Sequence, residues 1–162
     1  NKFSQAAELE PDNYINYLKR ATAYQLKGRP LSAIKDYSKI LELRPNHWKS
    51  LHYRGKCYLR LGSFTKAIED LRRTTLEDPK NNDAQKDLQK ALQFQNMYNT
   101  FQQKKESDPQ TSINLINEML TTCTESDDLY TSRAKLHLAL SDYDSALSDS
   151  TNAIKINQNN IE

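Results

Sequence analysis

Glycine is scarce in this sequence, with only three among 162 residues. Enzymes that bind nucleotides through Rossmann or P-loop folds need several glycines at fixed spacing, so both classes are disfavoured. No long apolar run is present and the mean hydropathy is −0.89, which excludes a membrane span. The two cysteines, Cys57 and Cys123, are too few for a disulfide framework or a metal cluster. We therefore expect neither membrane insertion nor a cofactor.

The formal net charge of +2 conceals a strong asymmetry along the chain. Residues 1–81 carry 16 Lys and Arg against 9 Asp and Glu, a net charge of +7. Residues 82–162 carry 7 against 12, a net charge of −5. Because a chain divided in this way is not uniformly basic, nucleic acid is not expected as a partner.

The sequence repeats itself with a period of 34 residues. The pairs of like residues at this spacing are Tyr24 and Tyr58, Gly28 and Gly62, Ala33 and Ala67, and Pro45 and Pro79. This period is typical of the tetratricopeptide repeat, a unit of two antiparallel helices. Straight-chain residues and the scarcity of glycine also favour helix. We predict an all-α fold, a right-handed superhelical solenoid of about four repeats.

The repeat register predicts a chain (1–162) in three parts. Residues 1–81 form a first subgroup, residues 82–106 one long helix, and residues 107–162 a second subgroup. The long helix is predicted because Ser112 follows Ala67 by 45 residues instead of 34, so the third repeat has an extended first helix. The helices are expected near residues 1–10, 14–27, 30–44, 48–61, 64–77, 82–106, 110–123, 127–140 and 143–157.

Small side chains are expected where the two helices of a repeat cross. The facing pairs are Ala21 with Ala33, Gly55 with Ala67, and Ala134 with Ala146. The dipeptides that open these crossings, Arg20-Ala21, Arg54-Gly55 and Arg133-Ala134, occupy one equivalent place in three repeats.

Catalytic signals are weak. His47, His52 and His137 belong to different repeats and show neither metal-ligand spacing nor a nucleophile beside them. Asp127, Asp128, Asp142 and Asp144 are explained as helix-start residues, because carboxylates favour the positive end of the helix dipole. We do not expect an enzyme.

One face of the first two repeats is a candidate protein-binding surface. In tetratricopeptide arrays the first helix of each repeat lines the concave face, and apolar groups exposed there suggest a binding patch. The alternative is an ordinary solvated helix face. The candidate residues are Ile15, Leu18, Lys19, Thr22, Leu26, Lys49, His52, Tyr53, Lys56, Leu59 and Arg60.

One known groove of such arrays is missing. Adaptors for the acidic tails of cytosolic heat-shock chaperones use a carboxylate clamp that begins with Lys and Asn on one helix and Asn on the next. Here those places hold Leu18, Thr22 and Tyr53. This argues strongly against the cytosolic tail-binding class.

The sequence resembles the repeat region of a family of endoplasmic-reticulum J-domain co-chaperones, known as DnaJ homologue subfamily C member three. The resemblance covers nearly the whole chain, and the displaced third repeat makes it more specific. It is carried by residues 14–24, Gly28, residues 33–37, Arg54-Gly55, the spacer 84–97, residues 119–123, residues 133–135 and residues 146–149.

This resemblance implies a co-chaperone that holds unfolded client proteins and stimulates the lumenal chaperone BiP through a J domain. No His-Pro-Asp motif of a J domain occurs here, so we expect a fragment of a longer protein that lacks its J domain. The resemblance implies the endoplasmic reticulum lumen, with the cytoplasm as the alternative. The alternative function is a regulatory scaffold that binds and inhibits a folded partner such as an eIF2-alpha kinase.

Overall fold

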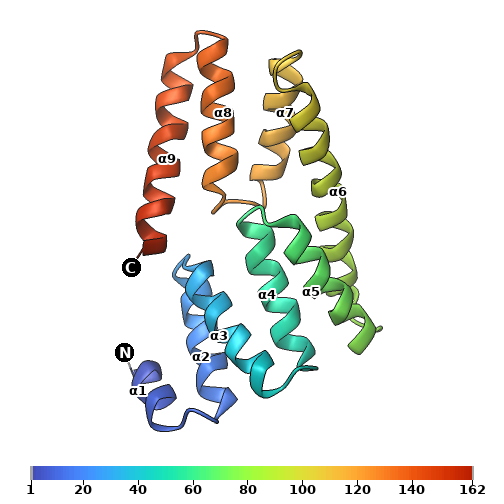
Figure 1. Ribbon diagram of the computed structural model, residues 1–162, viewed down its shortest axis with the longest axis vertical. Coiled ribbons are helices and arrows are strands. Elements are labelled where there is room, and N and C mark those ends of the chain that lie inside the picture. The colour runs from blue at the N-terminus through green and yellow to red at the C-terminus, as the bar shows by residue number, and fades with distance from the viewer. Residues whose placement is uncertain (1, 162) are drawn as a thin grey trace. The chain divides into compact units, whose positions relative to one another are not determined.

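The computed structural model describes residues 2–161 of the chain. Within this range it contains nine α-helices and no strand (Figure 1). The helices are α1 (Lys2–Leu9), α2 (Tyr14–Leu26), α3 (Pro30–Leu43), α4 (Trp48–Arg60), α5 (Phe64–Glu77), α6 (Asn82–Lys104), α7 (Pro109–Leu120), α8 (Asp127–Ala139) and α9 (Tyr143–Ile161). None of the described helices is long and apolar enough to cross a membrane.

The all-helical fold agrees with the prediction from the 34-residue period. The long α6, with 23 residues, confirms the extended first helix of the third repeat. Two boundaries differ from the expected ones by three residues or more: α7 ends at Leu120 instead of 123, and α9 runs past 157 to Ile161. The early end of α7 follows from a tight turn in which the backbone N–H groups of Thr122 and Cys123 donate to the carbonyl of Met119.

The chain forms two compact units. Unit 1 contains Asn1–Tyr58 and Thr65–Lys90, and unit 2 contains Leu59–Phe64 and Ala91–Glu162. Helix α6 continues from one unit into the other. The domain subgroups 1–81, 82–106 and 107–162 remain a prediction from the repeat register.

Unit 1 is built on helix pairs that approach closely at small residues. Ala21 on α2 and Ala33 on α3 are fully buried. A Cβ placed on Gly55 of α4 would lie 2.9 Å from Cγ of Leu71 and 3.4 Å from the carbonyl oxygen of Ala67 on α5. Because real Cβ atoms need more room, this crossing requires glycine.

Unit 2 has a core of its own. Helices α8 and α9 lie side by side and antiparallel (Figure 1). Phe64, Phe94, Tyr98 and Phe101 form a continuous aromatic cluster, with ring centroids 5.6–6.2 Å apart between neighbours. One defect lies on α7: the fully buried Ser112 hydroxyl, at the position where other repeats have alanine, has no hydrogen-bond partner among the described residues.

A buried ion pair recurs in the repeats. Each pair joins an arginine on the first helix to an aspartate 16 residues later on the second helix, through two hydrogen bonds of 2.6–2.8 Å. All three aspartates are buried. The pairs are Arg20 with Asp36, Arg54 with Asp70, and Arg133 with Asp149. The repeat register located the arginines, but only the structure identified the aspartates as their partners.

Two of these arginines also reach back to the preceding repeat. Nη1 of Arg54 donates to Oγ of Ser38 at 2.9 Å, and Nη1 of Arg133 donates to Oδ1 of Asn117 at 2.6 Å. Both acceptors lie 16 residues before the arginine. A single guanidinium therefore ties together three helices, because its planar fork of donors binds one carboxylate through two hydrogen bonds and still has an N–H for a third helix.

Candidate functional site

Four of the predicted residues line one cavity in unit 1. Leu18, Lys19, Thr22 and Leu26 of α2 border a hollow of about 400 Å³ together with Phe3 of α1 and Ala23. Their spacing of one, three and four residues places them on one helix face. Leu26 is 86% exposed, so the hollow presents apolar surface directly to solvent.

Local sequence explains why α2 presents this face. The side chain of Asn13 caps the helix by accepting from the backbone N–H of Ile15 at 3.2 Å. At the other end Gly28 adopts φ +67°, a left-handed conformation that glycine enters without strain. Arg20 and Ala21 face α3, which leaves Leu18, Thr22 and Leu26 on the open side.

The other predicted residues of unit 1 lie outside this cavity lining. Ile15 and Tyr53 are partly exposed, and Lys49 and Lys56 are exposed. The Tyr53 ring stacks between His52 and Tyr37, with centroids 5.8 Å and 6.0 Å away. Burial raises the pKa of Tyr37 above its ordinary value. Tyr53 therefore presents a partly exposed aromatic ring that stacks against two neighbouring rings.

Two residues predicted to be exposed are buried. Leu59 is 2% exposed, and it follows Leu51 and Gly55 at intervals of four residues on the buried stripe of α4. His52 is 7% exposed and its Nε2 lies 2.8 Å from Oδ2 of Asp87. The prediction that these two side chains are open to a partner is wrong. Both errors arise because helices on either side of α4 leave only a narrow part of it in contact with solvent.

Two predicted cations have carboxylates beside them. Nη2 of Arg60, within unit 2, lies 2.9 Å from Oε1 of Glu125. Nζ of Lys56, within unit 1, lies 3.8 Å from the same Asp87 carboxylate that holds His52. Lys19 and Lys49 have no ion-pair partner among the described residues, and Nζ of Lys49 lies 5.4 Å from the centroid of the Trp48 ring.

Unit 1 as a whole is basic. It carries 17 Lys and Arg against 11 Asp and Glu, a net charge of +6, whereas unit 2 carries 6 against 10, a net charge of −4. Among the residues that line the cavity of unit 1, Lys19 is the one that carries charge.

The histidines have structural partners. Nδ1 of His47 lies 2.8 Å from Oγ of Ser50, and Nδ1 of His137 lies 3.2 Å from a carboxylate oxygen of Asp142. Burial, with Arg44 and Lys49 nearby, lowers the pKa of His47. Among the described residues no three His, Cys, Asp or Glu side chains are grouped so that they could hold a metal ion.

Comparison with known proteins shows what this chain is similar to. Residues 15–47 and residues 37–69 each match the tetratricopeptide repeat. DnaJ homolog subfamily C member 3 from Gallus gallus is 32% identical over 164 residues, which cover 99% of this chain and 32% of that protein. A crystal structure of the P58(IPK) TPR domain superposes with a TM-score of 0.87 at 25% identity, covering 95% of this chain and 44% of that one.

The chain is homologous to the tetratricopeptide-repeat region of DnaJ homolog subfamily C member 3. A shorter match supports this: a tetratricopeptide repeat and J domain-containing co-chaperone, DNJ1, from Cryptococcus neoformans var. grubii is 39% identical over 70 residues, 43% of this chain and 13% of that protein. The chain spans about a third of the length of the DnaJ homolog subfamily C member 3 proteins that it matches. Homology with a co-chaperone family supports a protein-binding role.

The sequence interpretation missed one part of this site. Phe3 borders the cavity from α1, and it was not among the residues predicted for the binding surface. The usable signal was that Phe3 lies on the second helix of a preceding repeat. That position brings it beside the first helix of the next repeat.

Proposed function

We propose that unit 1 binds unfolded or misfolded client polypeptides, with the cavity beside α2 as the point of contact. The observation that carries this proposal is the apolar surface that exposed Phe3 and Leu26 and half-buried Leu18 present around one hollow. A stable monomer usually buries such groups, and a group of them in a hollow is typical of a surface that a partner covers.

The form of the cavity suits clients without a common sequence. It is lined on one side by a single helix face and its rim holds one cation, Lys19, so it offers apolar contact and few directional hydrogen bonds. Surfaces of this kind accept many apolar side chains and select weakly among them.

In the full-length protein, we propose that the bound client is delivered to the chaperone BiP in the endoplasmic reticulum lumen. The support is the homology with DnaJ homolog subfamily C member 3. Delivery would require a J domain, which lies outside the sequence of this chain, and the repeats would contribute the holding step alone.

The test is suppression of aggregation. A chemically denatured reporter enzyme is diluted into buffer with the purified chain, and light scattering is followed. We expect Leu18→Ser combined with Leu26→Ser to abolish most of the suppression, because each change removes an apolar contact worth about 1.5–3 kcal/mol when buried. Suppression that is unchanged in a variant of native helix content would disprove the role of this cavity.

The matched control is Leu76→Ser on α5. Leu76 is 78% exposed, close to the value for Leu26, but it does not border the cavity. The control should suppress aggregation as the wild type does. Circular dichroism of all variants separates a lost contact from a lost fold.

A second candidate function is a regulatory scaffold for a folded partner such as the kinase domain of an eIF2-alpha kinase. The observation that favours it is the opposite net charge of the two units, +6 and −4. Such binding should weaken markedly as salt rises from 0.05 to about 0.5 M, because screening reduces charge attraction between exposed groups. Client binding through the apolar cavity should change little over the same range.

A further inference from the structure

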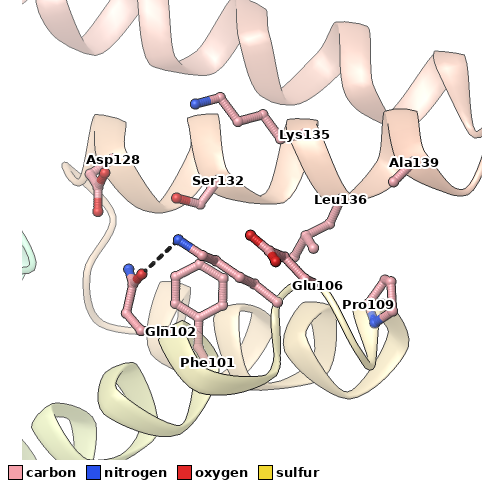
Figure 2. A pocket seen from close by; sticks show the side chains of 10 residues that line it. Phe101, Gln102, Glu106, Pro109, Asp128, Ser132, Lys135, Leu136 and Ala139 are labelled. Atoms are coloured by element: carbon pink, nitrogen blue, oxygen red, sulfur yellow. Dashed lines mark hydrogen bonds between the residues drawn. The ribbon is translucent and has the colours of Figure 1, made fainter.

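Unit 2 contains a hollow of about 540 Å³ between the end of α6 and one face of α8 (Figure 2). Helix α8 corresponds to α2 with an offset of 113 residues, the distance from Arg20 to Arg133, so this hollow borders the same helix face as the cavity of unit 1. Its charged lining residues are of both signs: Lys105, Glu106, Asp128 and Lys135. Because this lining favours neither sign of charge, we assign the hollow no ligand.

At the start of α8, two turns that are far apart in the sequence meet. The backbone N–H of Glu125, in the turn between α7 and α8, donates to the carbonyl of Arg60 at the end of α4 at 3.1 Å. The side chains of the same two residues form an ion pair, with Nη2 of Arg60 2.9 Å from Oε1 of Glu125. Both residues belong to unit 2. Since α4 is part of the second repeat and α8 opens the fourth, this contact skips the third repeat.

Gly62 allows the two turns to approach each other. A Cβ placed on Gly62 would lie 2.7 Å from Oγ and 3.3 Å from Cβ of Ser126, and 3.9 Å from Cδ1 of Leu129. Real Cβ atoms do not come as close as 2.7 Å to another heavy atom. A side chain at position 62 would therefore push the turns apart.

Ser126, which Gly62 approaches, also begins α8. Its Oγ accepts from the backbone N–H of Leu129 at 3.4 Å and so caps the helix. Its own backbone N–H donates to the carbonyl of Cys123 at 3.2 Å. Ser126 and Leu129 are each 1% exposed, and Cys123 is fully buried. The start of α8 and the turn that holds Cys123 are therefore covered while the two turns are in contact.

Few interactions hold this contact closed. The ion pair is partly exposed, with side-chain exposures of 34% for Arg60 and 17% for Glu125, and such pairs stabilise modestly. In the equivalent turn of the first repeat, the backbone N–H of Gly28 donates to the carbonyl of Gln25, within the same repeat. An element held by few long-range contacts opens locally at a lower free energy than the whole chain unfolds.

We propose that Arg60, Gly62, Glu125 and Ser126 form a turn latch, a conformational device that holds the start of α8 closed and opens without the unfolding of unit 1. Opening separates the two turns, releases the start of α8 and uncovers the thiol of Cys123. Cys57 on α4, in unit 1 and equally buried, stays covered. The turn latch does not rest on the proposed client binding, which concerns the cavity of unit 1.

The test compares the reactivity of the two cysteines. The full chain is alkylated with excess iodoacetamide under native conditions, and mass spectrometry of its peptides gives a separate rate for Cys57 and for Cys123. A buried thiol reacts only after local opening, so its rate reports how often the segment opens. We expect Gly62→Ala to accelerate Cys123 at least about tenfold and Cys57 less than about twofold. An unchanged rate at Cys123, or equal acceleration of both thiols, would overturn the turn latch.

Gly28→Ala is the matched control. Gly28 and Gly62 occupy equivalent turns with φ values of +67° and +72°, so alanine bears the same steric cost of a left-handed backbone at both positions. The control should leave the Cys123 rate within about twofold of the wild type. Acceleration equal to that in Gly62→Ala would show that backbone strain, and not the approach to Ser126, opens the turn.

A double-mutant cycle tests the contact between Gly62 and Ser126 directly. Ser126→Ala removes the oxygen that lies nearest to a Cβ at position 62. Adding Gly62→Ala to this variant should therefore accelerate Cys123 by a smaller factor than it does in the wild type. The same factor in both backgrounds would mean that the two positions act independently.

Arg60→Ala tests the ion pair without introducing a clash. It should accelerate Cys123 about two- to fivefold, as expected for a partly exposed ion pair. Arg72→Ala removes an exposed arginine of α5 outside the turn latch and should leave the rate as in the wild type. Circular dichroism checks that each variant keeps its helix content. Equal rates in Arg60→Ala and Arg72→Ala would remove the ion pair from the turn latch.

Discussion

Units 1 and 2 share their buried architecture and differ in what they present to a partner. Both contain the buried arginine–aspartate pair and a hollow on the same helix face. The cavity of unit 1 has Lys19 as its one charged lining residue, while the lining of the hollow in unit 2 carries both signs, with Lys105 and Lys135 beside Glu106 and Asp128. The difference teaches that helix packing restricts which residues can stand between the helices, whereas the residues on the helix face that borders the hollow can differ in charge.

The two units also differ in how closely their residues follow the pattern of the 34-residue repeat. The turn that ends α2 uses Gly28 at φ +67°, whereas the equivalent turn after α8 uses Ser141 at φ +61°. Unit 2 also has serine at position 112, where Ala33 and Ala67 stand in the earlier repeats. Unit 2 therefore contains two local defects that unit 1 lacks, and single substitutions can repair them.

The largest expected effect tests whether the buried ion pair is equivalent in the two units. Asp70→Ala in unit 1 and Asp149→Ala in unit 2 should each lower the free energy of unfolding by about 3–5 kcal/mol, because an arginine loses its buried partner. Urea unfolding measures this loss. Asp144→Ala, an exposed carboxylate, should cost less than about 1 kcal/mol. If only one aspartate is sensitive, the two units do not share this stabilising pair.

An effect of intermediate size is expected at the helix crossings. Ser112→Ala should raise the free energy of unfolding by about 1 kcal/mol, since it removes a buried hydroxyl that has no partner. Ala67→Ser makes the reverse change in unit 1 and should lower stability by about 1–3 kcal/mol. Thermal unfolding of the two variants checks the opposite signs. A Ser112→Ala variant less stable than the wild type would contradict the assignment of Ser112 as a defect.

The smallest effect is expected at the turn after α8. Ser141→Gly should stabilise the chain by about 0.5–1 kcal/mol. A non-glycine residue in the left-handed region bears a steric cost of about 1–2 kcal/mol, and removing this cost outweighs the loss of stability that comes from the higher entropy of glycine in the unfolded chain. The control is Gly28→Ser, which should destabilise by a similar amount. Differential scanning fluorimetry is sensitive enough to compare the two. A Ser141→Gly change without any gain would mean that the serine turn is relaxed.

Sequence reasoning selected four residues of α2 that border one cavity, and it failed in part on α4. On α2 the helical period alone brings Leu18, Thr22 and Leu26 to one face, since contacts within a helix depend only on spacing. His52 was misjudged because its partner Asp87 lies 35 residues further along the chain. The partner of Arg60, Glu125, lies 65 residues further along and was not foreseen either. Such pairings depend on how the helices pack, and no local sequence pattern predicts them.

The sequence by itself determined the helices, the repeat period and the extended α6, because each follows from periodic spacing and from glycine and proline at the turns. Only the tertiary structure decided which side chains remain open. It placed Phe3 beside α2, buried Leu59, and turned Glu106 into the hollow of unit 2. The physical reason is that the exposure of a side chain depends on which neighbouring helices pack against it, whereas helix formation depends largely on the sequence of one segment.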